Sequence, residues 1–440
     1  MRLTRLPWVA AATTVLVLAS AAVGVSPIRD AATLEPMPES GLSYSPAYLA
    51  GAPFFDTLDT LSLLTVAQHV AVLVTLILGY AAWRVWHRWR KGATSSKDGT
   101  VDRATPRAVL REVAFAGLAL LALVTVYGIG AIVPRPMAAL SVRNLNVLAV
   151  DVHSHTKYSH DGRPGWEAED VRAWHAASGY DAAYVTDHRS YRGAEEGVAA
   201  NPSVAGQGTV LLSGLEVVYG GERVNVLSAG RVYRGLTTDN LWDIDTIALA
   251  LASLVTPREP VIVQTIPARL DRMRPAEGPG APGARAIEIV DGAPRGLSQT
   301  RRERRRIIHL ADSLNLALVA GSNNHGWGRT APGWTLFHIP GWRGLAPDDL
   351  ANRIESAIRR DGRQATRVVE RRVAEPDGSP IRLALTVPIV TWRMLTTLST
   401  DQRVMWVVWA CVLAAVWFAA RRRLGPRSAV VGARSAVPGA

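Results

Sequence analysis

The sequence predicts an α/β protein in which a β/α domain, with a mainly parallel sheet that is open or closed into a barrel, is attached to about four transmembrane helices. The helices are predicted because a mean hydropathy of +0.10 over 440 residues is unusual for a purely soluble protein. The domain is predicted by the segment from about 141 to 400, where short β-branched runs alternate with amphipathic helical stretches. Polar side chains at the ends of several of these strands indicate where a functional site lies.

Composition excludes several classes of protein. Apolar residues make up 48% of the chain, which is too many for a disordered protein. A single cysteine, Cys411, excludes a disulfide scaffold and a cysteine-based zinc site. The formal net charge of +12 raises the question of nucleic acid, and the placement of the charges answers it.

Each of four apolar runs has close to the number of residues, about 20, that cross a bilayer as a helix. The runs are 7–25, 61–83, 113–133 and 404–420. A cleaved signal peptide is an alternative for the first run, because Ala19-Ser20-Ala21 forms a small-residue cleavage site after an apolar core. For the other runs the alternative is a buried core helix.

Charge asymmetry predicts the orientation of these helices. The segment 84–107 carries seven Lys and Arg against two Asp, whereas 26–60 carries one Arg against five acidic residues. Cytoplasmic loops are rich in Lys and Arg, so 84–107 and the tail 421–440 are expected in the cytoplasm of a multi-pass protein of the cell membrane. The large domain is then extracytoplasmic. Topology explains much of the positive charge, so the lipid bilayer is an expected partner and nucleic acid is not.

The chain is accordingly divided into five parts. They are a membrane region (1–140), the β/α domain (141–375), a membrane-proximal segment (376–403), the fourth span (404–420) and the tail (421–440). Within the domain, strands are expected at 146–152, 181–186, 209–217, 223–227, 260–265, 285–290 and 316–320, and helices at 166–178, 239–254 and 301–314. In β/α barrels, chemistry gathers where the strands end.

Imidazole and carboxylate groups follow four of these strands. His153 and His155 are two residues apart in an extended segment, so both side chains can face one ion. His188, Glu216 and the segment 321–326 follow other strands. Nitrogen and oxygen donors at the ends of several strands predict a site for Zn, Mn or Fe.

Four motifs carry a family resemblance. They are HSHTKYSHDG from His153, VTDH from Val185, GLEV from Gly214 and GSNNHGWG from Gly321. Over about 150–344 the sequence resembles the PHP family, named for polymerase and histidinol phosphatase domains. The resemblance implies a distorted seven-stranded β/α barrel with up to three metal ions at the carboxyl ends of its strands, and it implies hydrolysis of phosphoesters.

The same resemblance implies a ligand set. First-metal ligands are His153, His155, Glu216 and Asn323, where the family usually has Asp, and third-metal ligands are Asp161, His188 and His325. His160 is an alternative to Asp161. Arg223 and Ile266 stand where two histidines of the second metal are expected, with Pro267 as the anchor of that alignment. The prediction is therefore a reduced site that holds one or two divalent ions.

Three further side chains are assigned roles around this site. Arg223 and Arg329 are expected to stabilise negative charge on a phosphoryl group, because guanidinium can clamp phosphate with two hydrogen bonds. The alternative for Arg329 is a surface salt bridge. Asp187 is expected to orient a ligand imidazole, with a helix N-cap or a turn as its alternative.

Two functions follow from these residues. The first is a metal-dependent phosphoesterase that acts on a phosphorylated small molecule, a nucleotide or a lipid-linked phosphate. The second is a catalytically weakened sensor or binding module that signals through its membrane helices. An exonuclease fits poorly, because DNA is not the expected substrate outside the cell.

Overall fold

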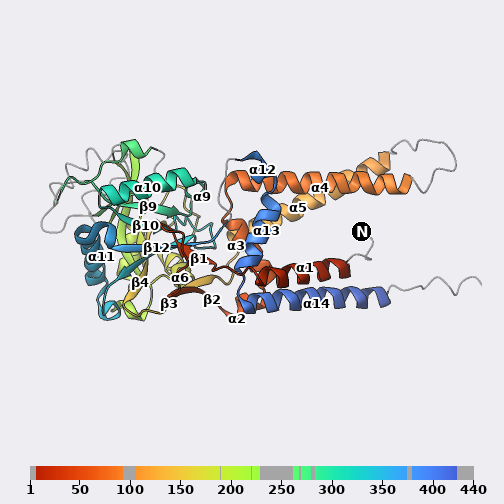
Figure 1. The fold of residues 1–440 in the computed structure, drawn as a ribbon. Coiled ribbons are helices and arrows are strands. Elements are labelled where there is room, and N and C mark those ends of the chain that lie inside the picture. The colour runs from red at the N-terminus through yellow and green to blue at the C-terminus, as the bar shows by residue number, and fades with distance from the viewer. Residues whose placement is uncertain are drawn as a thin grey trace, which may run out of the picture.

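A computed structural model describes residues 6–92, 106–188, 190–219, 221–227, 261–266, 269–278, 283–373 and 379–423. The expected helix 239–254 and the alignment anchor Pro267 lie outside these residues. The described chain forms a strongly curved mixed sheet covered by helices and a group of long helices that lead away from it (Figure 1).

Ten strands form the main sheet, in the order β1-β12-β11-β4-β5-β6-β7-β8-β9-β10. Their bounds are β1 Ile28–Asp30, β4 Val147–Ser154, β5 Ala182–Val185, β6 Val210–Tyr219, β7 Glu222–Leu227, β8 Val261–Gln264, β9 Ala284–Asp291, β10 Ala317–Gly321, β11 Gly333–His338 and β12 Thr366–Arg371. The pairs β4–β5–β6 and β8–β9–β10 are parallel, and the other pairs are antiparallel. A second sheet pairs β2 (Ser40–Tyr44) with β3 (Ala138–Val142).

The expectation of a mainly parallel, seven-stranded sheet is therefore wrong in strand number and in direction. Only two residues separate β6 from β7, and so short a connection joins antiparallel strands. Gly221 in this turn has a φ of +80°, which a residue without a Cβ adopts at no steric cost. Three strands of the sheet were not expected: β11 and β12 follow the last motif, and β1 precedes residue 141.

The sheet curls until its last strand returns to its middle. Just beyond β10, the backbone N–H of Asn323 donates to the carbonyl of His153 over 2.7 Å, and the N–H of His155 donates to the carbonyl of Asn324 over 3.1 Å. Ser154 and Asn324 form an isolated parallel bridge. The carboxyl ends of β4 and β10 therefore meet, and the sheet has the form of a half-barrel.

Helices cover the outside of this sheet. They are α6 (Ala168–Ser178), α7 (Arg192–Ala199), α9 (Pro294–Leu297), α10 (Arg301–Ser313) and α11 (Pro347–Asp361). The helix α6 begins with a capping box between Glu167 and Asp170 and ends at Gly179, which has the left-handed φ of +80°. Trp334 of β11 is fully buried behind it and donates from Nε1 to the carbonyl of Ser178 over 3.0 Å.

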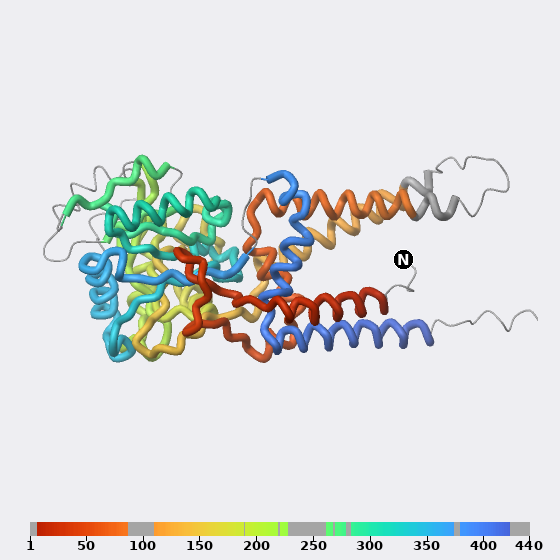
Figure 2. Tube along the Cα trace, viewed as in Figure 1, coloured from red at the N-terminus to blue at the C-terminus, as the bar shows by residue number. Residues whose placement is uncertain are grey.

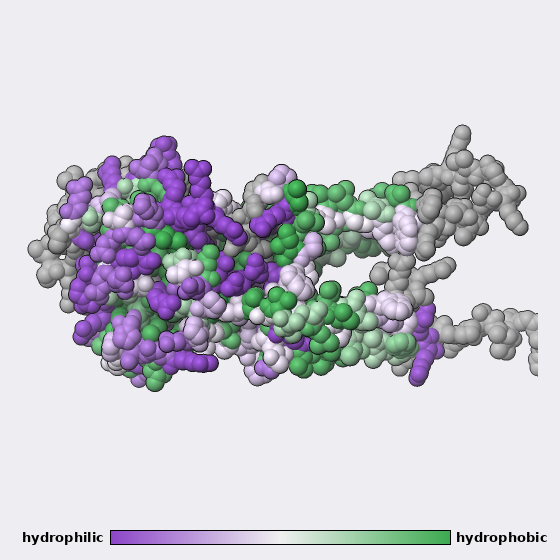
Figure 3. Space-filling view, viewed as in Figure 1, coloured by the Kyte–Doolittle hydropathy of each residue, from purple (hydrophilic) through white to green (hydrophobic). Residues whose placement is uncertain are grey.

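Four long apolar helices extend from one end of the half-barrel, namely α1 (Leu6–Ala21), α4 (Val66–Gly92), α5 (Pro106–Ile132) and α14 (Thr400–Arg423). In this view, hydrophobic residues cover much of their surface and hydrophilic residues cover much of the half-barrel (Figure 3). Among the described residues, three segments are long and apolar enough to cross a membrane: 66–86, 110–132 and 400–422.

Four membrane spans were expected, but only three helices of the described chain are long enough to cross a membrane. The first run, expected as 7–25, forms only the 16-residue helix α1, which lies alongside α14 (Figure 2). It ends at Ala21 because the chain must then enter β1 at Ile28. The second run begins at Val66 rather than 61, since α3 (Ala52–Ser62) is a separate short helix.

The half-barrel and the long helices meet at short elements around Asp59 of α3. These elements are α2 (Pro46–Ala50), α3, α12 (Pro380–Ala384) and α13 (Thr386–Thr397). Asp59 is 4% exposed, and its carboxylate accepts hydrogen bonds from Arg371 Nη1 of β12 (2.9 Å), Thr330 Oγ1 (3.0 Å) and Arg135 Nη1, with Tyr48 Oη 3.2 Å away. One buried carboxylate thus joins α3, the segment after α5, and two parts of the half-barrel.

Replacing Asp59→Ala is expected to destabilise the chain by roughly 3–5 kcal/mol, because two largely buried guanidinium groups lose their carboxylate. Thermal unfolding in detergent micelles measures this effect. The matched control is Asp312→Ala, since Asp312 is an exposed partner of Arg363, and its loss should cost less than about 1 kcal/mol. Equal melting temperatures for the two variants would contradict the structural role of Asp59.

Candidate metal centre

Side chains that can bind a metal gather where β4, β5, β6, β9 and β10 end. In four groups, the ligand atoms lie within 4.8 Å of one another: His155, His188 and His325; His153, His155 and Glu216; His160, Asp161 and His188; and His153, Glu288 and Asp291. Every metal ligand expected from the sequence except Asn323 is a member of at least one group. The predicted meeting of strand ends is thus present in the structure.

Glu216 lies at the centre of the cluster. Its Oε2 is 3.1 Å from His153 Nε2, 3.3 Å from His155 Nε2 and 3.3 Å from His188 Nδ1. Burial alone would raise the pKa of this carboxyl, but the surrounding imidazoles outweigh burial and hold the pKa well below its usual value. Glu216 is therefore a carboxylate, as a metal ligand must be.

His153 lies between two carboxylates. Its Nδ1 is 2.8 Å from Glu288 Oε1, while its Nε2 faces Glu216. Burial opposes the charged imidazolium, but Glu288 and Glu216 outweigh it and raise the pKa of His153 well above its ordinary value. In this arrangement His153 is protonated, so it would have to release a proton before it could bind a metal.

The tautomer of His155 follows from its neighbours. Ser159 Oγ donates its one proton to Asp187 Oδ1 over 2.9 Å, so it accepts the Nδ1–H of His155, also over 2.9 Å. The lone pair of His155 is consequently on Nε2, which is buried and has no hydrogen-bond partner in the described chain. Burial lowers the pKa of His155 well below its ordinary value, so the ring is neutral and ready to bind a metal.

Asp187 has no direct hydrogen bond to an imidazole of the described residues. Besides Ser159, it accepts hydrogen bonds from the backbone N–H of Thr156 (2.7 Å) and from Thr156 Oγ1 (2.6 Å), and burial raises its pKa to about 6. Its contact with His155 passes through the Ser159 hydroxyl. Sequence reasoning anticipated the position of Asp187 near the site but did not identify Ser159 as the intermediate.

His325 presents a second unpartnered nitrogen. Its Nδ1 donates to the carbonyl of Asn323 over 3.0 Å, which leaves the lone pair on Nε2. This Nε2 is buried without a hydrogen-bond partner in the described chain and is 3.2 Å from Asp161 Oδ1. The rings of His155 and His325 are stacked with their centroids 3.9 Å apart. Two neutral imidazoles therefore lie together with unused lone pairs.

Asn323 departs from ordinary backbone geometry. Its φ is +47°, in the left-handed region that Asn tolerates better than most residues. Its Nδ2 donates to Asp291 Oδ2 over 3.3 Å, whereas its Oδ1 is buried with no hydrogen-bond partner among the described residues. An amide oxygen in this state is a suitable, if weak, ligand for a cation.

Asp161 and His160 lie at the exposed edge of the cluster. Asp161 Oδ1 is 3.4 Å from His188 Nε2, and the Asp161 side chain is 48% exposed. His160 is 3.8 Å from Asp161, and its side chain is 64% exposed. Burial lowers the pKa of the His188 imidazole to about 4, so it is neutral near pH 7.

Arg223 extends across the cluster. Its Nη1 is 3.2 Å from Glu216 Oε1 and 3.2 Å from His188 Nε2, and half of the side chain is exposed. Ile266 has a buried side chain, and its backbone N–H donates to Glu288 Oε2 over 3.0 Å. The two residues that stand where histidines were expected therefore both lie at the cluster, with the Arg223 guanidinium beside the central carboxylate.

Glu288 and Asp291, both on β9, are the site residues that sequence reasoning missed. Both are buried, and burial raises the pKa of Glu288 to about 7. The signal was present in the sequence: Glu288 interrupts an apolar strand, and Asp291 ends that strand before Gly292. A carboxylate on the inward face of a strand needs a partner, because an unpaired buried charge is costly.

Arg329 lies apart from the cluster. Its guanidinium is 5.3 Å from the Trp166 ring centroid, and its Nη2 donates to the carbonyl of Ile132, at the end of α5, over 3.4 Å. The residue is 8% exposed, so it is not the surface salt bridge considered as its alternative. Its described contacts connect the loop after His325 to α5 and include none of the candidate ligands.

The donor set fits a divalent metal. Neutral imidazole, ionised carboxylate and amide oxygen are the ligand types of Zn, Mn and Fe sites. Two buried imidazole nitrogens and one buried amide oxygen have no hydrogen-bond partner among the described residues. Such orphaned groups are rare in folded proteins unless a ligand satisfies them.

No protein-family model and no curated protein matches this chain. Among solved structures it is similar to PsfC from Pseudomonas syringae, at 18% identity and a TM-score of 0.36, over 57% of this chain and 98% of that one. It is similar to a two-domain protein from Bacteroides vulgatus that contains a predicted PHP-like metal-dependent phosphoesterase (12% identity, TM-score 0.30, 52% and 66% of the two chains). It is also similar to the lesion-specific endonuclease PfuEndoQ from Pyrococcus furiosus (14% identity, TM-score 0.35, 48% and 56%). These likenesses are too distant to assign an activity.

Replacing Ser159→Ala is expected to weaken divalent metal binding by about 10–100-fold, because the hydroxyl fixes the tautomer of His155. Titration of the full chain with Zn or Mn against a competing chelator measures the affinity. Ser203→Ala is the matched control, since in the described part of the chain the Ser203 hydroxyl donates to Gln207 on the surface. An unchanged affinity for Ser159→Ala would show that the hydroxyl does not prepare His155 for a metal.

Proposed function

We propose that this chain is a metal-dependent phosphoesterase of the PHP type with a reduced metal site. The observation that carries the proposal is the pair of neutral imidazoles, His155 and His325, whose buried Nε2 atoms lack hydrogen-bond partners in the described chain. They lie beside His188, with Asp161 and the Glu216 carboxylate within reach. Three imidazoles and two carboxylates in one place are more than a folded core needs.

One or two divalent ions are proposed, of Zn, Mn or Fe. The ligands proposed for the first are His155, His188, His325 and Asp161. The ligands proposed for the second are His153, Glu216, Glu288, Asp291 and Asn323. A divalent ion bound there would activate water and neutralise charge on a phosphoryl group.

The remaining chemistry belongs to the chain's own side chains. The half-exposed Arg223 guanidinium borders the cluster and has donors to spare beyond its contact with Glu216, so it is proposed to bind and orient the phosphoryl oxygens. Asp161 lies at the exposed edge, where substrate would enter. The Asp187–Ser159 pair holds His155 in its metal-binding tautomer.

The substrate is proposed to be a phosphorylated small molecule, a nucleotide or a lipid-linked phosphate at the outer face of the cell membrane. The long helices are proposed to cross that membrane more than once and to hold the half-barrel on the extracytoplasmic side. In support, Arg163 and Arg329, which flank the ligand loops, both donate to the carbonyl of Ile132 at the end of α5. Nucleic acid is not proposed as a partner.

A catalytically weakened sensor is the second candidate. It is favoured by the ion pair between Arg223 and Glu216, since a guanidinium placed against a ligand carboxylate competes with a cation for it. A sensor would bind one ion and turn over no ester. An esterase would do both, so metal content and turnover together distinguish the two functions.

Replacing both His155→Ala and His188→Ala is expected to remove the first bound ion and hydrolysis of bis(p-nitrophenyl) phosphate together. The full chain is refilled with Zn, Mn and Fe in turn, and metal content is measured by elemental analysis. His309→Ala on α10 is the matched control, because His309 is exposed and outside the cluster. Metal retained in full by the double variant would show that the site is elsewhere; no metal in the unaltered chain would refute both functions.

Replacing Arg223→Gln is expected to lower kcat by about 100-fold or more, since guanidinium stabilises charge that develops on phosphoryl oxygens. Metal content should not fall, because Glu216 loses only a competitor for the ion. Steady-state kinetics and elemental analysis are made on the same preparations. Arg269→Gln, an exposed arginine paired with Asp271, is the control. A kcat equal to that of the control would exclude Arg223 from the reaction.

A further inference from the structure

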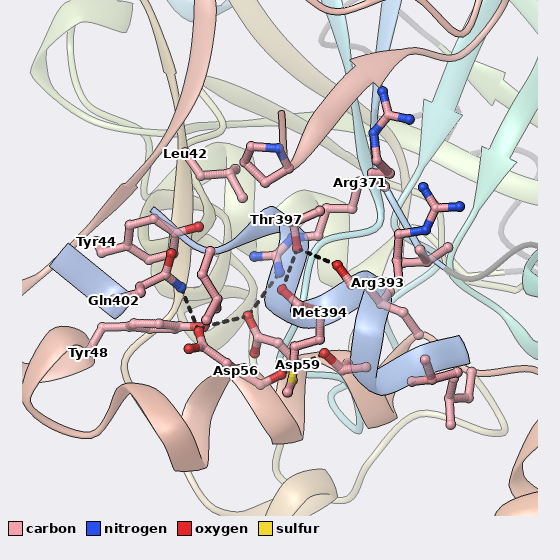
Figure 4. Close-up of a pocket in the computed structure, with 18 residues that line it drawn as sticks. Leu42, Tyr44, Tyr48, Asp56, Asp59, Arg371, Arg393, Met394, Thr397 and Gln402 are labelled. Atoms are coloured by element: carbon pink, nitrogen blue, oxygen red, sulfur yellow. Dashed lines mark hydrogen bonds and ion pairs between the residues drawn. The ribbon is translucent and has the colours of Figure 1, made fainter. Parts of the chain in front are cut away.

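A pocket lies where the half-barrel meets the long helices, apart from the metal cluster (Figure 4). It encloses about 600 Å³, including the part open to solvent, between β2, α3, α13 and the end of β12. Part of its wall is apolar, including Leu42, Leu64 and Met394. The pocket therefore has both an apolar wall and charged lining residues.

Three arginines line this pocket: Arg371, Arg372 and Arg393. The Nε and Nη2 groups of Arg371 are buried and have no hydrogen-bond partner among the described residues. The guanidinium of Arg393, on α13, has no hydrogen bond or ion pair with any described residue. Guanidinium donors of this kind are suited to a phosphate, which accepts several hydrogen bonds at once.

The two acidic residues of the pocket do not satisfy these donors. Asp59 is occupied by the four groups described above, of which only Nη1 of Arg371 belongs to the lining arginines. Asp56 accepts hydrogen bonds from Tyr48 Oη (2.9 Å), Gln402 Nε2 (2.6 Å) and Trp406 Nε1 (2.8 Å), all of them neutral. Among the described residues, neither carboxylate accepts a hydrogen bond from Arg393 or from Nε or Nη2 of Arg371, so these donors remain for an anion.

The edge of the pocket faces the position expected for a bilayer surface. The helix α13 supplies Arg393 and Met394 to the pocket, and it also exposes Ile389 and Trp392, with exposed fractions of 37% and 42%. Large apolar side chains exposed on a short helix, with a Trp among them, are typical of helices that lie in the membrane interface. The helices α4 and α14 both begin near α13, on the side of the half-barrel, and extend away from it (Figure 1).

We propose that this pocket binds the phosphate headgroup of an anionic membrane phospholipid. Arg371 and Arg393 bind the phosphate, and the apolar wall contacts the glycerol backbone and the first part of the acyl chains. The proposal rests on the proposed placement of the long helices in a membrane and not on the esterase activity. It assigns the pocket a resident lipid, distinct from any substrate at the metal cluster.

The test uses the full chain in nanodiscs of phosphatidylcholine with or without phosphatidylglycerol, followed by native mass spectrometry of the released protein. We expect one phosphatidylglycerol per chain. Replacing Arg393→Gln should reduce its retention by about tenfold or more, the effect of one charge-assisted hydrogen bond. Arg360→Gln on α11 is the control, because Arg360 is an exposed partner of Asp361 and lies outside the pocket lining; it should retain the lipid.

Several results would overturn the proposal. Equal retention by Arg393→Gln and the unaltered chain is one, and displacement of the lipid by excess inorganic phosphate is another, since it would identify a site for free anions. If Arg393→Gln fails to fold, Met394→Trp decides: it fills the apolar wall without changing charge and should expel the lipid, and full retention would refute the site. Failure of the unaltered chain to enter nanodiscs would refute membrane placement and this proposal together, whatever the esterase assay gives.

Discussion

The candidate metal centre depends on one buried carboxylate. Glu216 has been withdrawn from water, which costs several kcal/mol for an isolated ion, and in the described structure its cationic partners are the His153 imidazolium at 3.1 Å and the Arg223 guanidinium at 3.2 Å. The neutral imidazoles of His155 and His188 lie 3.3 Å from the same carboxylate. Glu216 is on β6, and the groups around it lie on or directly after β4 and β5 and on β7. A carboxylate so placed fixes the ends of four strands relative to one another, because each must deliver its partner to the same oxygen atoms.

The candidate metal centre also requires the strong curvature of the sheet. His153 and His155 are on β4 and directly after it, while Asn323 and His325 follow β10, which is far away in the order of strands. The backbone bonds between His153 and Asn323 and between His155 and Asn324 close that distance. A shift of one residue in this contact would turn the alternating side chains to the opposite faces of the sheet, so the register of β4 against the turn after β10 sets the donor geometry.

Local patterns in the sequence predict part of the candidate metal centre. The spacing of His153 and His155, and the polar residues after successive strands, predicted which side chains meet, because strand ends converge in a curled sheet. Glu288 and Asp291 were missed, since each looks like an ordinary polar residue in a short strand until its burial is known. Arg329 was placed at the site by its nearness to His325 in sequence, yet its side chain extends to Trp166 and α5. Strand directions and the length of α1 depend on tertiary connections that local periodicity does not record.

The candidate metal ligands and the long helices are also connected through hydrogen bonds to Asp59. Thr330 lies five residues after His325, and its hydroxyl donates to Asp59, which is bound on its other side by Arg371 at the wall of the junction pocket. A group bound to Arg371 would therefore act on the carboxylate that holds the loop after His325. Because Asp59 is buried and two of its partners, Arg371 and Arg135, are charged, a displacement at one partner is costly unless the others move with it. The junction is thus a physical connection between the long helices and the candidate metal ligands.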